Sequence, residues 1–212
     1  RGGKMHACLS GCIVQCSNVV HDEDGNYLTS GLEFETLTLL GANIAMESWE
    51  YVAQLDRLCD DVGLDTIETG SALAVLMDAG RAEWGDIDEA KRIIAEEIAG
   101  NTELGQIVGN GAVAVGKAFE HARVPAVKGQ SLPAWDARPL KVTGVTYASS
   151  AMGADHTAGM STDASIKPED YARVSQELQI MNAIVDSSGF CQFLGSNLDD
   201  IRAAFGHMVG TE

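Results

Sequence analysis

Four of the five cysteines in this chain could act together as ligands of a soft metal. Three of them, Cys8, Cys12 and Cys16, lie close to the start of the chain, and Cys191 lies far away in the sequence. Thiolates grouped in this way bind soft metals, and a distant cysteine often completes the ligand set of an iron–sulfur cluster once the fold brings the chain ends together. This spacing therefore points to redox chemistry.

The spacing of the first three cysteines also predicts a bend between them. On one continuous helix their sulfur atoms would form a stripe about 12 Å long, which is too long for one cluster to contact. Gly11, between Cys8 and Cys12, can supply the bend. Two other interpretations stay open from the residues alone: three small, buried apolar side chains, or a zinc site.

A second pattern, Asp-x-x-Gly followed by an apolar residue and then Asp or Cys, occurs twice in the chain. The simplest interpretation is that each glycine ends a helix and each aspartate is merely solvated. Carboxylates beside helix ends can also accept hydrogen bonds from the N–H groups of a flat heterocycle such as a pterin. Because one copy also contains a candidate metal ligand, the pair favours ligand binding. The two copies are Asp60-x-x-Gly63-Leu64-Asp65 and Asp186-x-x-Gly189-Phe190-Cys191.

The composition is that of a globular protein with a strongly acidic surface. Of 212 residues, 45% are hydrophobic, which is enough for the core of one large domain or two small ones. The 14 Lys and Arg residues against 31 Asp and Glu give a formal charge of −17. Such a charge repels nucleic acid and anionic membranes, so a neutral or cationic partner fits better. No apolar run reaches the ~18 residues that span a bilayer.

The cysteine count and the chain start indicate a compartment and a larger parent protein. An odd number of cysteines grouped at one end is unlike a disulfide-stapled secreted domain, so we expect a reducing compartment, by default the cytoplasm. The chain begins at Arg1 rather than Met, lacks an apolar signal stretch and enters its cysteine motif almost at once. We therefore expect a fragment.

Helical periodicity recurs along the chain, whereas strand-like alternation barely occurs outside residues 142–147, so an all-α, multihelical fold is predicted. Helix caps are expected at Ser48, at Asp86 with Glu89, and at Ser196 with Asp199. The expected helices cover 33–46, 48–63, 66–79, 87–99, 111–122 and 168–185, with a shorter one from 103 and a last one from 196.

Between residues 124 and 159 the helical pattern breaks down around three prolines and several glycines. Long irregular segments of this kind usually persist for function. We place the domain boundary there. The prediction is a helical domain with the cysteine motif over 1–139 and a second, incomplete helical domain over 140–212.

Seven short segments resemble, in order and approximate spacing, one known enzyme family. The sequence looks like the second and third domains of the tungsten-containing aldehyde ferredoxin oxidoreductases over nearly its whole length, and the two Asp-x-x-Gly loops with Cys191 are the most specific part. The segments are Glu-Phe-Glu-Thr at 33–36, Leu-Gly-Ala-Asn at 40–43, Leu-Cys-Asp-Asp-Val-Gly-Leu-Asp-Thr-Ile at 58–67, Glu-Leu-Gly at 103–105, Val-Lys-Gly at 127–129, Leu-Pro-Ala-Trp-Asp-Ala-Arg at 132–138 and Gly-Ala-Asp-His at 153–156.

The resemblance implies two cofactors. In the family four cysteines hold a 4Fe-4S cluster, and the two Asp-x-x-Gly loops bind the pterins of a tungsten (here tungsten or molybdenum) bis-pterin. Because Cys191 belongs to both features, cluster and pterin would be neighbours and electrons would have a short exit to ferredoxin. The matching cluster ligands are Cys8, Cys12, Cys16 and Cys191, and the matching pterin-binding residues are Asp60, Leu64, Asp65, Asp186 and Phe190.

The family also uses a glutamate and a histidine near the tungsten, which match Glu35 and His156. Oxidising a small aldehyde to a carboxylate requires activation of water, removal of protons and polarisation of the carbonyl, which a buried carboxylate and an imidazole can share. The resemblance thus implies Glu35 as base and His156 as hydrogen-bond donor or proton shuttle. Without it, an ion-paired glutamate and a structural histidine are the ordinary interpretations.

Two departures from the family pattern bear on these expectations. Three residues separate Cys8 from Cys12, where the family commonly has two, and the family's β-rich first domain, which covers the other side of the bis-pterin, has no counterpart here. An isolated fragment is therefore expected to be apo and inactive, with exposed surfaces that favour association, for example as a homodimer. The alternatives are a noncatalytic helical binding module and a small zinc-structured domain.

Overall fold

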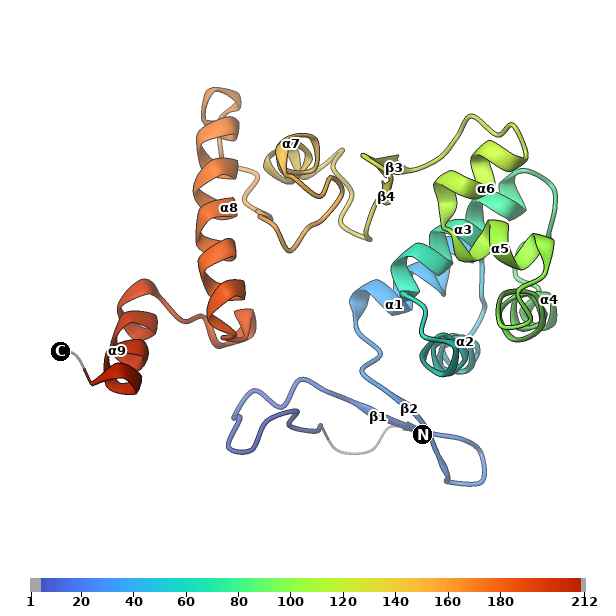
Figure 1. Cartoon of the computed structure of the whole chain (residues 1–212), viewed down its shortest axis with the longest axis horizontal. Helices are drawn as coiled ribbons and strands as arrows, with labels where there is room; N and C mark the ends of the chain where they lie inside the picture. The colour runs from blue at the N-terminus through green and yellow to red at the C-terminus, as the bar shows by residue number, and fades with distance from the viewer. Residues whose placement is uncertain (1–4, 211–212) are drawn as a thin grey trace. The chain divides into compact units, whose positions relative to one another are not determined.

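The computed structural model describes residues 5–210 and confirms a mostly helical fold. The strands in this range form only two small two-stranded antiparallel sheets. The chain divides into two compact units, Arg1–Ala134 and Trp135–Glu212 (Figure 1). The boundary predicted between residues 139 and 140 stays a prediction. No helix in the described range has both the length and the apolar character that crossing a bilayer requires.

The first unit begins with a hairpin that the sequence patterns did not predict. Strand β1 (Val19–His21) pairs with β2 (Tyr27–Ser30), and a tight turn joins them. The turn itself follows from nearby residues: the Asn26 N–H donates to Asp22 Oδ1 at 2.8 Å, and Gly25 supplies a φ of 83°. Strands of three and four residues leave too few alternating positions to be recognised by periodicity.

The single helix predicted over 33–46 is wrong. The structure has α1 (Phe34–Leu39), then a 3-10 turn η1 (Ala42–Ile44). Gly41 takes a non-helical conformation, with φ −111° and ψ −102°, and this ends the α-helical path. Leu40 and Ile44 nevertheless both lie fully buried in the core, whereas Leu37, on the same face of the predicted helix, is 39% exposed, so apolar periodicity described the burial only in part.

Helices α2 (Trp49–Val62) and α3 (Thr66–Asp78) begin and end close to where their caps predict. Ser48 Oγ accepts a hydrogen bond from the Tyr51 N–H at 3.3 Å, and Gly63 ends α2 in the left-handed conformation. Helix α3 is buried over most of its length and contacts α1, α5 and α6, as Figure 1 shows. It is therefore the central element of the first unit.

The helix predicted over 87–99 is continuous but changes type. Helix α4 (Ile87–Arg92) runs on into a π-helical segment, η2 (Ile93–Ile98), whose first two isoleucines are fully buried. The predicted capping box is half formed, because Asp86 caps the Glu89 N–H while the Glu89 carboxylate accepts from Glu83 instead. The unit is completed by α5 (Glu103–Gly109), α6 (Ala112–Ala118), β3 (Ala126–Val127) and β4 (Gln130–Ser131). Helix α6 is thus shorter than the predicted 111–122.

The second unit corrects the one strand-like pattern, because residues 142–147 belong to a helix, α7 (Lys141–Ser149). Its β-branched threonines are buried and hydrogen-bonded: Thr146 Oγ1 lies 2.8 Å from Ser175 Oγ on the adjacent helix α8 (Tyr171–Ser188). Tertiary packing overrides the β-propensity of these residues. The irregular segment expected over 124–159 is therefore interrupted by α7.

The last helices start near their predicted positions. Pro168 opens a 3-10 turn, η3 (Pro168–Asp170), that leads directly into α8. A second 3-10 turn, η4 (Gln192–Leu194), precedes α9 (Leu198–Val209). Helix α9 has a complete capping box formed by Asn197 and Asp200, one residue later than the predicted pair Ser196 and Asp199.

Candidate functional site

The N-terminal cysteines lie in a loop that is closed at its base. The His6 N–H donates to Ser17 O at 2.7 Å and the Ser17 N–H donates to His6 O at 3.2 Å, so an antiparallel bridge joins the two ends. The chain turns at Gly11, whose φ is 84°, which confirms the predicted bend. We call residues 6–17 the cysteine loop.

The thiols of the cysteine loop and of the second unit are chemically suited to a soft metal. Cys8 and Cys191 are exposed, Cys12 and Cys16 are half-buried, and none is in a disulfide. Within residues 5–210, however, no three His, Cys, Asp or Glu side chains gather closely enough to hold a metal ion. Cysteine thiols are nevertheless the ligand type that an iron–sulfur cluster requires. That these four cysteines bind one cluster together stays a prediction.

The fifth cysteine, Cys59, differs from the other four. It is fully buried in α2, and burial raises the pKa of its thiol to about 12, with the charge of Asp56 acting in the same direction. A thiol with this pKa stays protonated at neutral pH, and metal ligation needs the thiolate. Cys59 is therefore a core residue, in line with its absence from the predicted ligand set.

The first Asp-x-x-Gly loop joins α2 to α3. Gly63 is left-handed, with φ 82°, and the N–H groups of Gly63 and Leu64 both donate to Cys59 O at 2.8 Å. Asp65 then caps α3, accepting from the Glu68 N–H at 2.7 Å. Asp60 lies exposed on the last turn of α2. The loop thus brings Asp60, Leu64 and Asp65 onto one helix–helix junction.

The second loop joins α8 to η4 in the same order of conformations. Gly189 is left-handed, with φ 75°, Phe190 follows it, and Cys191 occupies the cap position of η4. Asp186 Oδ1 accepts from Gln192 Nε2 at 2.9 Å. The prediction that both loops lie at helix ends is confirmed, and Cys191 occupies the position that Asp65 takes in the first loop.

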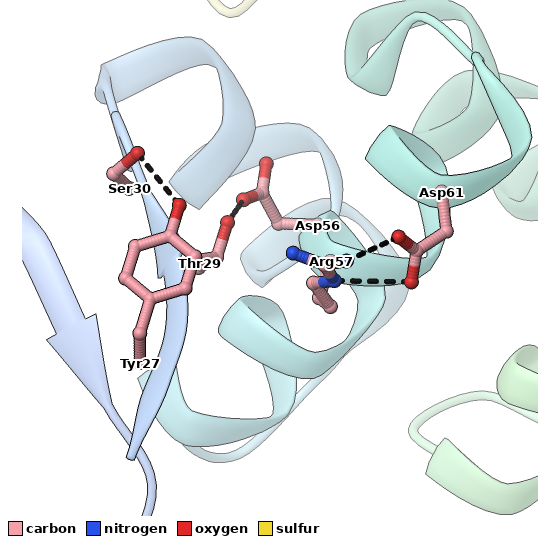
Figure 2. A network of polar contacts seen from close by, with 6 residues as sticks. All are labelled: Tyr27, Thr29, Ser30, Asp56, Arg57 and Asp61. Atoms are coloured by element: carbon pink, nitrogen blue, oxygen red, sulfur yellow. Dashed lines mark hydrogen bonds and ion pairs between the residues drawn. The ribbon is translucent and has the colours of Figure 1, made fainter. Parts of the chain in front are cut away.

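Asp56, one helical turn before Asp60, was missed by the sequence analysis (Figure 2). It is 5% exposed, and its Oδ2 accepts a hydrogen bond from the Thr29 hydroxyl at 2.5 Å. Burial raises the pKa of Asp56, the Thr29 hydrogen bond opposes this rise, and the charge of Asp60 adds to it. The signal was present in the sequence, since Asp56 lies on the same helical face as Val52 and Cys59.

The Thr29–Asp56 hydrogen bond connects the hairpin to α2. In Figure 2, Thr29 points from β2 toward Asp56, while Tyr27 bonds Ser30 on the hairpin and Arg57 pairs with Asp61 on α2. The hairpin continues from the cysteine loop, and α2 ends in the first Asp-x-x-Gly loop. This buried hydrogen bond therefore connects the hairpin that follows the cysteine loop to the helix that leads into the first Asp-x-x-Gly loop.

Glu35, the predicted base, lies half-buried in the first turn of α1. Its Oε2 accepts a hydrogen bond from the Ala134 N–H at 2.6 Å. The position of α1 depends on Gly70 in α3, because a Cβ there would lie 2.4 Å from Leu39 O. Glu35 is therefore placed by a close helix–helix approach and oriented by a backbone donor.

His156 lies in the second unit, half-buried in the loop that follows α7. Its carbonyl oxygen accepts from the Gly159 N–H at 3.2 Å, and Asp155 Oδ1 accepts from the Thr157 N–H at 2.9 Å, so the loop has a defined local conformation. Tyr147, on α7, is buried and donates its hydroxyl to Trp135 O at 2.7 Å.

Asp136 and Arg138 form a charge pair in the segment before α7. The guanidinium of Arg138 lowers the pKa of Asp136, and the Arg138 N–H acts in the same direction. This pair stabilises the segment that leads into α7.

Comparison with known proteins decides the family. The family model described as aldehyde ferredoxin oxidoreductase, domains 2 and 3, matches residues 2–212. This chain belongs to the aldehyde ferredoxin oxidoreductase family. It is 27% identical to a tungsten-containing aldehyde ferredoxin oxidoreductase of Pyrococcus furiosus over 86% of its length, and 29% identical to one of Thermococcus kodakarensis over 87%.

The chain spans only about a third of the aldehyde ferredoxin oxidoreductases that it matches, 34% of the Pyrococcus furiosus protein and 36% of the Thermococcus kodakarensis protein. The shared part corresponds to domains 2 and 3 of the family. The family membership confirms the resemblance and the helical fold class. The roles of individual residues in this chain stay predictions.

Proposed function

We propose that this chain is part of a tungsten or molybdenum bis-pterin oxidoreductase that oxidises aldehydes to carboxylic acids and passes the electrons through a 4Fe-4S cluster to ferredoxin. The observation that carries the proposal is the pair of Asp-x-x-Gly loops, which share one sequence of conformations in a chain of this family. The proposed setting is the cytoplasm, where thiols stay reduced.

The two loops are the proposed pterin-binding elements. Each has a left-handed glycine followed by a partly buried apolar residue, Leu64 or Phe190, which can pack against a flat ring. Asp60 and Asp186 are exposed carboxylates at the helix ends and can accept N–H hydrogen bonds. Asp65 is already engaged as the cap of α3, so its contribution is to fix the loop and to offer its remaining lone pairs.

The bound metal supplies a two-electron acceptor for the conversion of an aldehyde and water to a carboxylic acid, two protons and two electrons. In the proposed mechanism Glu35 removes a proton from water, and the Ala134 N–H holds one of its carboxylate oxygens in place. His156 donates a hydrogen bond to the aldehyde oxygen or carries the second proton away. Both side chains are half-buried, which limits competition from solvent.

Cys8, Cys12, Cys16 and Cys191 are the proposed ligands of the 4Fe-4S cluster. All four are free thiols with at least partial exposure, as ligation requires, whereas Cys59 is buried and protonated. The cysteine loop must then accommodate one residue more between its first two ligands than the family commonly has. Its left-handed turn at Gly11 lies between these two ligands.

Metal analysis and absorption spectroscopy of the complete protein that carries this chain, prepared without oxygen, test the proposal. We expect tungsten or molybdenum, about four iron atoms per chain, and an iron–sulfur absorption band. Stoichiometric zinc with unfolding by a chelator would support the zinc-structured alternative instead. Absence of tungsten, molybdenum and iron would contradict the proposal.

A matched pair of cysteine variants sharpens this test. In the complete protein, Cys191→Ser should lose the iron and the visible absorption band, while Cys59→Ala should keep both. A noncatalytic binding module predicts no iron in either variant or in the parent protein. Equal iron retention by the two variants would remove Cys191 from the ligand set.

A further inference from the structure

A cavity of about 330 Å³ lies in the first unit, and no residue of the Asp-x-x-Gly loops lines it. One wall is the β1–β2 hairpin with its turn, and the other is the first turns of α2. Its volume is at the lower end of the range in which proteins bind small organic ligands. None of the proposed catalytic, pterin-binding or cluster-binding residues lines it.

The cavity combines apolar surface with three carboxyl groups and one imidazole, that of His21. Val20, Leu28 and the indole of Trp49 supply the apolar part, and Asp22, Glu23 and Glu50 supply carboxyl groups. No Lys or Arg is among its lining residues, all of which the structure describes. Three carboxyl groups against one imidazole disfavour an anion, and a neutral apolar molecule would leave the carboxylates without a counterpart.

Local hydrogen bonds favour the charged form of Asp22. The Asn26 N–H and its side-chain amide donate to the two oxygens of Asp22, and the backbone hydrogen bond from Asn26 lowers the pKa of Asp22. Each oxygen keeps a second lone pair for a ligand. Glu50 lies one turn before Gln54 on the same face of α2, which places an amide oxygen beside the carboxylate.

The aromatic wall favours the same ligand class. Trp49 is 41% exposed and is the first residue of α2, which Ser48 caps. The face of an indole attracts a cation within about 6 Å. The positive end of the α2 dipole opposes a cation, but it amounts to about half an elementary charge, against three carboxylates.

We propose that this cavity binds an organic cation, specifically a primary ammonium group carried on an apolar body. The ammonium group hydrogen-bonds to the carboxylates of Asp22 and Glu50, and the apolar body packs on Val20, Leu28 and the indole of Trp49. The formal charge of −17 on the whole chain draws such a ligand toward the protein.

Calorimetric titration of the complete protein tests this with three probes: phenethylammonium, its longer homologue phenylpropylammonium, and the neutral 2-phenylethanol. We expect saturable binding of at least one ammonium probe, with the alcohol binding at least about tenfold more weakly. Absence of saturable binding of both ammonium probes up to about 10 mM, or equal binding of amine and alcohol, would overturn the proposal.

Variants at the cavity assign the binding to these residues. Glu50→Gln should weaken ammonium binding about fivefold, and Trp49→Leu about fivefold to tenfold, whereas Trp49→Phe keeps an aromatic face and should lose less. Glu103→Gln is the matched control, since it removes the same charge from the first turn of another helix, α5. Equal affinity of the Glu50→Gln and Glu103→Gln proteins for the ammonium probes would show that the cavity is not the binding site. Iron and tungsten content should stay unchanged in all four, so failure here is separate from failure of the proposed redox function.

Discussion

The two Asp-x-x-Gly loops adopt the same backbone conformations in the same order, but different contacts hold them in place. In the first loop, two N–H groups converge on the carbonyl of the fully buried Cys59, and Asp65 caps the buried helix α3. In the second, Gly189 bonds only within its own turn, Cys191 makes no side-chain cap, and the η4 turn that follows is exposed. One loop is fixed by the core of its unit, and the other by local hydrogen bonds.

This difference shows how one pattern can serve two kinds of ligand. At equivalent positions, the core-supported loop has a carboxylate that is already engaged, and the locally supported loop has an exposed thiol. A thiolate that binds metal must be accessible and able to adjust, whereas a cap must be fixed. If the first loop depends on the core and the second does not, substitutions around the first should lower stability more than substitutions in the second.

Gly70→Ala should cause the largest loss of stability. The added Cβ would lie 2.4 Å from Leu39 O, so α3 and α1 must separate. We expect the free energy of unfolding to fall by about 3 kcal/mol in chemical denaturation. Gly109→Ala is the control, because its Cβ meets only the Ile98 side chain, at 3.3 Å, and should change stability by less than about 0.5 kcal/mol. Equal stability of the two variants would show that the close approach is not limiting.

Asp56→Ala should lower the free energy of unfolding by about 2 kcal/mol at neutral pH, because it leaves the buried Thr29 hydroxyl without its acceptor. Asp56→Asn keeps an acceptor without the charge and should be as stable as the parent or more so. Thermal and urea unfolding of both variants measure this. If the asparagine variant were as damaged as the alanine variant, the charge of Asp56 would be needed for stability.

The raised pKa of Asp56 also fixes the sign of a pH effect. Because the folded state holds the proton more tightly than the unfolded chain does, Asp56 contributes stability fully below its ordinary pKa of 3.8. That contribution is lost as the pH rises through the folded-state pKa. The stability of the parent protein relative to Asp56→Asn should therefore decline with rising pH above 3.8 and then level off. A difference that grows with pH would contradict the direction of the pKa shift.

Asp65→Ala and Cys191→Ala compare the two loops directly. Loss of the Asp65 cap should lower the stability of the first unit by about 1 kcal/mol. Loss of the Cys191 side chain, which caps nothing, should change stability by less than about 0.5 kcal/mol in the absence of metal. Hydrogen exchange of α3 and of α8 reports on each unit separately. Similar costs at the two positions would mean that both loops are supported alike.

Thiol labelling should distinguish the buried Cys59 from the other four cysteines, and it needs no substitution that could change stability. In the metal-free native protein, Cys8, Cys12, Cys16 and Cys191 should react with iodoacetamide, while Cys59 should react only after unfolding. Peptide mass spectrometry of native and denatured samples measures the pattern. Native labelling of Cys59 would show that the core behind the first loop opens readily.

Local signals in the sequence predicted the helix ends around the loops well. Ser48, Gly63 and Gly189 act through hydrogen bonds and backbone conformations that depend on nearby residues alone, so their positions follow from chemistry within a few residues. The bend at Gly11 was predictable for the same reason.

Features that depend on distant residues were not predictable in this way. The break at Gly41, the helix over 142–147 and the burial of Asp56 each depend on packing against elements far away in the sequence. Family resemblance supplied Glu35 and His156, whose roles no local pattern indicates. The cavity beside Trp49 likewise forms between the hairpin and α2, which are separate in the sequence.

The bridge between His6 and Ser17 has a consequence for metal uptake. A linear peptide with the same three cysteines must lose chain entropy to bring its ends together, and that cost grows with the logarithm of the loop length. Here the hydrogen-bonded base, continuous with the hairpin, has already joined the ends. Uptake of a metal by this ring of residues therefore starts from a partly ordered host, and should outcompete an unstructured peptide of identical sequence for the same ion.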